Sequence, residues 1–176
     1  MKKMIAIIFI FSGGMQSSVF AASDGSVGTT STGTTVISAT IPKLIRARSF
    51  ADFNLGSYSG TGDVNANDDL NISTNYGTSA RTYTVRATGS GAASAFTITD
   101  GTQTIAYNVY YNDATGTGGR VAMTTNVNLT AQTNASKPLS DTTLNANLSI
   151  EILQANLQAV DAAAFTGTIT LLFTPE

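Results

Sequence analysis

Apolar and polar residues alternate along most of the chain, and a period of two predicts β-strands rather than helices. The alternation is clearest from Tyr83 to Val85, from Ile105 to Tyr111 and from Leu148 to Ile152. Eight segments fit a short strand: residues 53–56, 69–74, 82–87, 95–99, 104–111, 120–123, 126–131 and 147–153. Turn-forming Gly, Asn and Asp residues separate them, and only residues 153–163 could hold a helical turn or two. This order of elements predicts an all-β antiparallel sandwich.

A further alternating segment lies near the start of the chain, at residues 34–42. It places Ile37, Ala39 and Ile41 on one face, and Pro42 ends the run. A short apolar strand that stands ahead of the main strands is available to pair with a partner outside its own domain. We therefore treat it as a candidate donor strand.

The last alternating segment, residues 165–173, ends close to the carboxyl terminus and places Ile169, Leu171 and Phe173 on one face. An exposed apolar edge strand promotes aggregation unless another strand pairs with it. A sandwich that lacked one strand would offer a groove beside such an edge, and the candidate donor strand of a second copy has the pattern to fill it. The domain that receives this strand is predicted to span residues 43–176.

The first residues resemble a secretory signal. Lys2 and Lys3 precede an apolar run at residues 4–11, and residues 19–21 place small side chains where a signal peptidase reads them. The run is shorter than the roughly 18 apolar residues that a membrane span needs. We predict cleavage after residue 21, followed by a flexible polar leader at residues 22–33.

Charge and composition restrict the chemistry of the mature chain. Removing two of the 9 basic residues with the signal leaves 7 against 11 acidic residues, a net charge of −4, which argues against nucleic acid and anionic membranes as partners. The chain has no Cys and no His, so it lacks thiol nucleophiles, imidazole bases and the usual ligands of transition metals. We expect no cofactor, no small-molecule substrate and no enzymatic activity; a carboxylate-based hydrolase is a minor alternative.

Residues 62–70 are the one stretch that resembles a metal-binding loop. Three oxygen-bearing side chains occupy alternate positions, at Asp63, Asn65 and Asn67. However, Asp68 stands where a calcium loop needs Gly, and Thr74 stands where it needs a bidentate Glu. We interpret the stretch as a polar turn that leads into a strand at Leu70. Asp68 and Asp69 are adjacent, so on a strand they would point to opposite faces and could not act as a catalytic pair.

Two other features have structural interpretations. The glycine-rich residues 115–120 lack the Lys and Ser/Thr of a phosphate-binding loop, so they predict a hairpin or inter-strand loop. Alternation places Tyr107 and Tyr111 together in the core and leaves Tyr110 facing outward. The arginines scattered among the strands are predicted to face solvent.

Four segments together give the chain a resemblance to a known family: TTVISATIP (34–42), FADFNLGSY (50–58), AFTITDGTQTIAYNVYYND (95–113) and the closing residues 147–176. In its pattern of strands and spacings the chain resembles the subunits of chaperone-usher pili, in particular the spore-coat-U-like and colonisation-factor-like branch. The resemblance covers nearly all of the mature chain.

The resemblance implies an incomplete immunoglobulin-like sandwich that a donor strand completes. It implies a periplasmic pilus chaperone, an outer-membrane usher and other pilus subunits as partners, with passage through the periplasm to a surface fimbrium of a Gram-negative bacterium that supports adhesion or biofilm formation. The donor residues carried over are Ile37, Ala39 and Ile41, with Val36 if the register slips. The residues carried over for the chaperone-contacting groove edge are Ile169, Leu171, Phe173 and the carboxyl-terminal Glu176.

A different class of function is also compatible with the sequence. In this alternative the chain is a self-complete secreted β-sandwich with a binding, coat or matrix role, and residues 34–41 fold back into their own domain. Stable multimers on an unboiled gel would distinguish the two. Within the pilus hypothesis, the sequence leaves a shaft subunit and a minor adaptor both open.

Overall fold

The computed structural model describes residues 22–77 and 81–176, and the chain forms two compact units, Met1–Ile41 and Pro42–Glu176. The predicted signal peptide lies outside the described residues. In the described part of the first unit, Ser23 and Thr34 form an antiparallel bridge through two backbone hydrogen bonds of 3.1 and 3.0 Å. None of residues 35–41 belongs to a strand.

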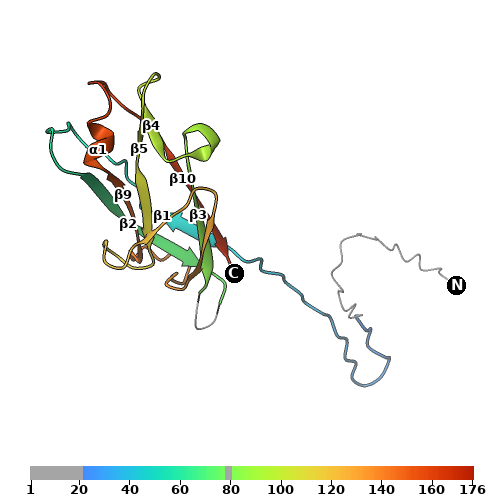
Figure 1. The fold of residues 1–176 in the computed structure, drawn as a ribbon. Helices are drawn as coiled ribbons and strands as arrows, with labels where there is room; N and C mark the ends of the chain where they lie inside the picture. The colour runs from blue at the N-terminus through green and yellow to red at the C-terminus, as the bar shows by residue number, and fades with distance from the viewer. Residues whose placement is uncertain (1–21, 78–80) are drawn as a thin grey trace. The chain divides into compact units, whose positions relative to one another are not determined.

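Within the second unit, five strands form one antiparallel sheet in the order β1-β2-β9-β6-β7 (Figure 1). Their bounds are Ile45–Arg48 for β1, Val64–Thr74 for β2, Ala146–Ile152 for β9, Asn108–Asn112 for β6 and Val121–Ala122 for β7. The glycine-rich residues 115–120 connect β6 to its antiparallel partner β7, which confirms the predicted hairpin loop.

Three strands form a second antiparallel sheet in the order β10-β3-β8, and two short strands form a separate pair. The bounds are Ile169–Pro175 for β10, Tyr83–Gly89 for β3, Asn128–Gln132 for β8, Thr97–Thr99 for β4 and Thr104–Ala106 for β5. Helical structure in the described residues is limited to the 3-10 turn η1 (Ala92–Ser94) and α1 (Gln154–Leu157), and no described helix is long and apolar enough to span a membrane.

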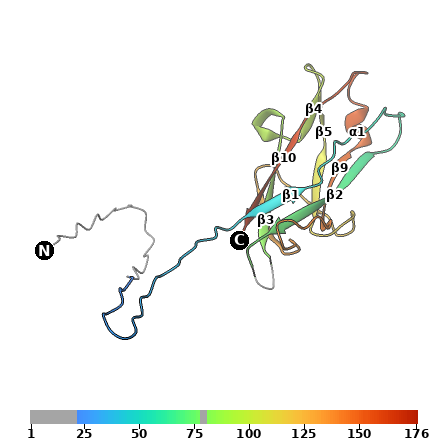
Figure 2. The same ribbon diagram turned by 180° about the vertical axis from the view of Figure 1, so that it is seen from behind.

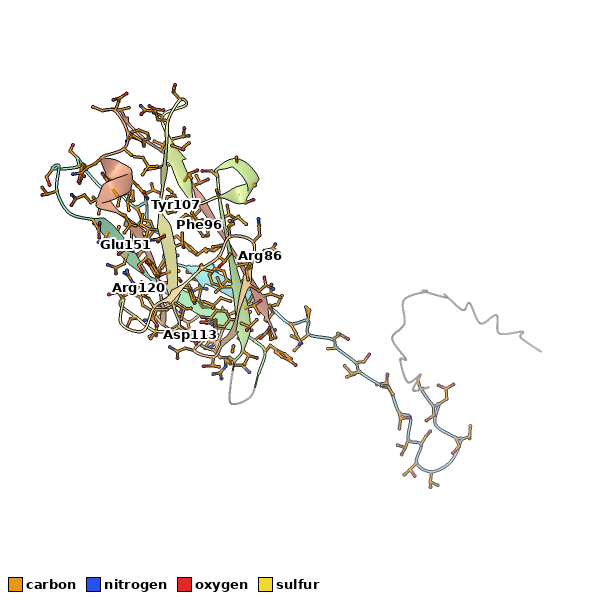
Figure 3. The ribbon with its side chains drawn as sticks, in the orientation of Figure 1. Arg86, Phe96, Tyr107, Asp113, Arg120 and Glu151 are labelled. Carbon is orange, nitrogen blue, oxygen red and sulfur yellow. The ribbon has the colours of Figure 1, made fainter. Side chains whose placement is uncertain are left out.

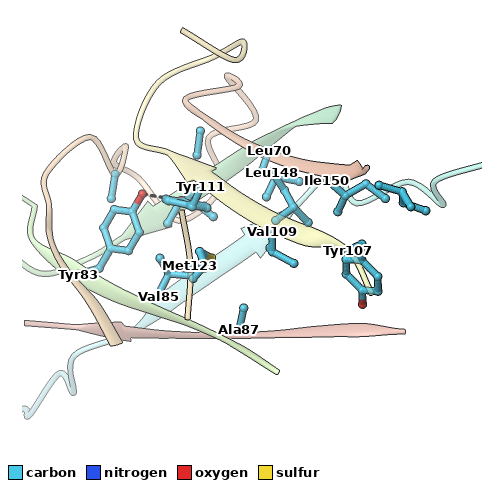
Figure 4. Close-up of a cluster of buried hydrophobic side chains, with 14 of the residues drawn as sticks. Leu70, Tyr83, Val85, Ala87, Tyr107, Val109, Tyr111, Met123, Leu148 and Ile150 are labelled. Atoms are coloured by element: carbon cyan, nitrogen blue, oxygen red, sulfur yellow. Dashed lines mark hydrogen bonds between the residues drawn. The ribbon is translucent and has the colours of Figure 1, made fainter. Parts of the chain in front are cut away.

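One core joins the inner faces of the two sheets. A single buried cluster contains residues of both sheets (Figure 4): Leu70 and Ile72 of β2, Ile150 of β9, and Val85 and Ala87 of β3. These residues occupy alternate positions on their strands, so the period of two places them on one side of each sheet. Burying one large apolar side chain stabilises the fold by about 1.5–3 kcal/mol. The predicted all-β, antiparallel sandwich class is confirmed.

Several predicted details were wrong. Residues 62–70 do not form a polar turn, because β2 begins at Val64 and pairs continuously with β9 from Val64 to Leu70. Residues 53–56 form no strand. The terminal strand begins at Ile169 rather than at residue 165, and it runs on to Pro175.

Candidate functional site

Four strands lie at the edges of the two sheets and carry no further ladder among the described residues: β1 and β7 in one sheet, β10 and β8 in the other. β10 pairs along its whole length with β3 and has no strand on its other side, and β1 ends the five-stranded sheet in the same way. β1 and β10 contact each other, as both ribbon views show (Figures 1 and 2). Beyond β1, residues 49–63 form no strand. An edge strand with free N–H and C=O groups is a template for another strand.

A groove of about 1160 Å³ opens at the start of β10, where Ile169 lines it, and reaches the core. Its walls are residues 50–58 and residues 161–169. Its floor is apolar and comes from the inner face of the sandwich: Val64, Ile98, Ile105, Tyr107, Leu148, Ile150 and Ile152. An apolar floor of this kind suits an extended segment with apolar side chains.

The wall at residues 161–169 is held close to the β4–β5 pair. Thr99 and Thr166 exchange two backbone hydrogen bonds of 2.9 and 3.0 Å. A Cβ atom on Gly167 would lie 2.9 Å from the carbonyl oxygen of Thr97, so only glycine permits this approach. Residues 162–164 are three alanines whose small side chains leave the groove wide.

The opposite wall, residues 50–58, is attached to β2 by one carboxylate. Asp68 accepts a hydrogen bond of 2.8 Å from the backbone N–H of Ala51, whereas the carboxylate of Asp69 faces Gly116 and Asn147. The side chains of the two adjacent aspartates therefore point to opposite faces of β2, as predicted. Phe53 and Leu55 pack partly against the core from this wall.

The predicted groove-edge residues lie together on one face of β10. Ile169 lines the groove, and Ile169, Leu171 and Phe173 are all half-buried against the core, while Leu172 points away and is exposed. The ring of Phe173 lies 6.2 Å from the ring centres of both Tyr83 and Tyr111. Aromatic pairs at this distance add to the energy of burial.

A buried hydrogen-bond network supports the end of β10 near Phe173. The hydroxyls of Tyr83 and Tyr111 lie 2.7 Å apart (Figure 4), and Tyr83 donates a hydrogen bond of 2.5 Å to Asp113. Burial raises the pKa of the Tyr83 hydroxyl far above its ordinary value, and the neighbouring Tyr111 adds to this. Burial likewise raises the pKa of Tyr111. Both tyrosines therefore stay neutral in the folded protein.

The carboxyl terminus is fixed to the start of β3. The backbone N–H of Glu176 donates a hydrogen bond of 2.9 Å to the Thr82 carbonyl, and the Thr82 hydroxyl donates one of 3.2 Å to the Glu176 carbonyl oxygen. The one ion pair in the described part of the chain joins Arg120 and Glu151 elsewhere. The role of Glu176 toward a chaperone stays a prediction.

The predicted donor residues belong to the first unit. Ile37 and Ile41 are 91% and 80% exposed, and Val36 and Ala39 are exposed as well. Several exposed apolar side chains close together in the chain are typical of a segment that binds another surface. The donor role of these residues stays a prediction.

A second polar cluster lies on the outer face of the five-stranded sheet, where Figure 3 labels Arg120 and Glu151. Tyr110 donates a hydrogen bond of 2.7 Å to Glu151, and the Arg120 guanidinium lies 4.1 Å above the Tyr110 ring. The hydrogen bonds from Tyr110 and Asn108 lower the pKa of the Glu151 carboxyl. Because Arg120 ends the β6–β7 loop, this cluster fastens that loop to the sheet.

In the residues that the structure describes, no three acidic, His or Cys side chains are grouped to hold a metal.

Sequence reasoning found the β10 face but missed the groove walls. Residues 50–58 and 161–164 have no regular alternation, and the two walls lie more than a hundred positions apart in the sequence. Their one local signal is the run of small residues at 162–164, which leaves space without indicating what fills it.

The sequence matches no protein-family model and no curated protein. Among solved structures, the chain is similar to a chain in a chaperone–tip adhesin complex described as vital for synergistic activation of CFA/I fimbriae biogenesis, with a TM-score of 0.55 and 19% identity. The match covers 75% of this chain and 41% of that one. It shows a shared fold.

A second solved structure is more distant. It is the CsuC–CsuE chaperone–tip adhesion subunit pre-assembly complex from archaic chaperone-usher Csu pili of Acinetobacter baumannii, with a TM-score of 0.43 and 14% identity. The match covers 76% of this chain and 40% of that one. The chain thus spans about two fifths of the length of both matched chains.

Proposed function

We propose that this chain is a non-enzymatic structural subunit of a chaperone-usher surface pilus, and that it polymerises by donor-strand exchange. The observation that carries the proposal is the apolar groove of about 1160 Å³ that opens at the first residue of the edge strand β10. The same chain carries an exposed alternating segment at residues 36–41. One copy thus offers both a place for a strand and a strand to fill it.

The dimensions of the two parts agree. An eight-residue strand extends about 27 Å, and the seven residues of β10 extend about 23 Å, so a donor at residues 34–41 could pair along the full edge. Alternation would direct Ile37, Ala39 and Ile41 toward the apolar floor. Each of the two isoleucines would contribute about 1.5–3 kcal/mol on full burial, in addition to the backbone ladder. Such a strand would dissociate very slowly.

The shared fold supports the choice of pathway. The similar structures are complexes of chaperones with tip subunits from fimbriae and pili. We infer that a periplasmic chaperone covers the groove before assembly, that an outer-membrane usher exchanges it for the donor strand, and that the neighbours in the fibre are further pilus subunits. The protein would pass through the periplasm to the surface of a Gram-negative bacterium, where the fibre would support adhesion or biofilm formation.

The test is gel mobility with and without boiling. We expect the full chain to give a ladder of multimers when unboiled and one monomer band after boiling, because the inserted strand is kinetically trapped. Ile37→Asp combined with Ile41→Asp should abolish the ladder, because a charge cannot be buried in the apolar groove. Val27→Asp is the matched control: Val27 is also highly exposed in the same unit but lies outside the donor segment, so its ladder should persist.

Two results would contradict the proposal. A full chain that remains a stable monomer without helper proteins would favour the self-complete sandwich. A ladder that survives both isoleucine substitutions would show that the multimers do not depend on residues 34–41.

A further inference from the structure

The segment that joins the candidate donor strand to its own domain is short and fixed. Three residues, Pro42 to Leu44, separate Ile41 from the first residue of β1, Ile45. The Asn75 side chain holds both ends of this linker: its amide donates 2.9 Å to the Pro42 carbonyl, and its oxygen accepts 2.7 Å from the Leu44 N–H. The linker is therefore part of the domain surface rather than a flexible arm.

Further contacts hold the linker against the end of β2. The Leu44 carbonyl accepts hydrogen bonds from the backbone N–H of Asn75 at 3.1 Å and from the Thr74 hydroxyl at 2.7 Å. The Lys43 ammonium lies 3.7 Å from the centre of the Tyr76 ring. The three side chains Lys43, Leu44 and Tyr76 form what we call the junction patch.

The junction patch exposes apolar surface that the described residues of the chain do not cover. Leu44 is 45% exposed and Tyr76 is 39% exposed. Single exposed apolar residues are common on protein surfaces. Here Leu44 belongs to the linker and Tyr76 contacts its Lys43, so two exposed apolar side chains at the linker that follows the candidate donor segment require a more specific explanation.

The linker length decides what must lie against this patch. Four residue steps place the Cα atoms of Ile41 and Ile45 at most about 14 Å apart. If Ile41 is buried in the groove of an acceptor copy, the surface of that copy must come within that distance of Ile45, the first residue of β1. The donor's Lys43, Leu44 and Tyr76 are the side chains nearest to it.

Charge supports the same partner. Of the residues that line the groove, the charged ones are Asp52 and Asp161, both acidic, whereas the linker carries Lys43. Opposite charges on two approaching surfaces favour the correct orientation more than they add affinity.

We propose that the junction patch is a second interface between successive copies of this chain, formed against the rim of the acceptor groove. This inference rests on the proposed strand exchange and goes beyond it. The patch fixes the angle between neighbouring domains, so the fibre is a stiff rod with a defined turn per subunit rather than a chain of beads on loose linkers.

The chain has no cysteine, so a single introduced thiol can report on this interface. Tyr76→Cys is prepared in the full chain, and the monomer and multimer fractions of one preparation are treated with a maleimide. We expect labelling to be roughly tenfold slower in the multimer, because reaction requires an accessible thiolate. Val121→Cys is the control: Val121 is 49% exposed and lies on β7, at the sheet edge opposite β1, and should label equally in both fractions. Leu44→Cys provides a second reporter if Tyr76→Cys impairs assembly.

A flexible insertion separates this inference from strand exchange itself. Six Gly/Ser residues between Ile41 and Pro42 add up to about 20 Å of reach. We expect the multimer ladder to remain and the protection of Tyr76→Cys to disappear. A ladder in which Tyr76→Cys and Leu44→Cys react as fast as in the monomer would overturn the junction interface alone. The absence of any ladder from the full chain would overturn both proposals.

Discussion

Tyr83, Tyr111 and Asp113 show how single residues hold the terminal strand in place. Both hydroxyls are buried and satisfied by hydrogen bonds, and the Phe173 ring packs on both tyrosine rings. The network therefore links β10 to β3 and β6 through side chains, in addition to the backbone ladder with β3. A buried polar group is costly unless it is paired, so loss of one member should affect the others.

The raised pKa values of these tyrosines predict a loss of stability at alkaline pH. In the unfolded chain both hydroxyls ionise near the ordinary value of 10.0, whereas in the folded protein they keep their protons. The folded state then binds more protons, so above pH 10 the free energy of unfolding should fall by about 1.4 kcal/mol per pH unit for each tyrosine. Urea titrations at about pH 8 and about pH 11 measure this slope.

Variants assign the slope to these residues. Tyr83→Phe should lower the free energy of unfolding near neutral pH by about 1–3 kcal/mol, because it leaves Asp113 with one donor fewer. It should also remove one tyrosine's share of the alkaline slope, and Tyr83→Phe with Tyr111→Phe should remove two. An alkaline slope that the double variant leaves unchanged would show that other groups cause it.

At the scale of elements, β10 has one face for the core and the other for solvent. Leu171 faces the core and Leu172, its neighbour on the same strand, is exposed. Leu171→Asp should destabilise the domain by about 3 kcal/mol or more, because it places a charge against apolar side chains. Leu172→Asp should change stability by less than about 1 kcal/mol.

The two β10 variants are compared by their soluble yield from the periplasm and by urea unfolding of whatever accumulates. We expect Leu171→Asp to be degraded or insoluble and Leu172→Asp to accumulate normally. Equal losses from both substitutions would contradict the assignment of faces on β10.

The elements also show what could be predicted from the sequence. Strict alternation predicted β3, β9 and the β10 face, because each strand has one apolar side. The first half of β2 was missed because Asn and Asp favour turns locally, yet its pairing with β9 overrides that preference. Residues 53–56 have strand-like composition but no neighbouring strand to pair with in the described part of the chain. The groove could not be predicted, since its walls come from distant segments without a period.

At the scale of the whole molecule, the groove connects the surface of the second unit to its core. The floor side chains Ile105, Leu148 and Ile150 belong to the buried cluster and yet border the open groove. These three side chains are only 3–6% exposed, so a strand inserted there would add stability mainly by burying its own apolar side chains against them. Stability and assembly should therefore depend on the same event.

This dependence can be tested by supplying the donor strand within one molecule. A copy of residues 34–41 is attached after Glu176 through a Gly/Ser linker of roughly ten residues, which can extend about 35 Å and so return along the 23 Å of β10. The attached strand has a high effective concentration at its own groove and should outcompete strands from other molecules. We expect a monomer on an unboiled gel, with a melting temperature at least about 10 °C above that of the monomer without the attachment. The matched control carries Ile37→Asp and Ile41→Asp in the attached copy only, and it should return to multimers and to the lower melting temperature. If the control is as stable and as monomeric as the intact attachment, then the groove does not recognise the isoleucines, and the chain does not assemble through this segment.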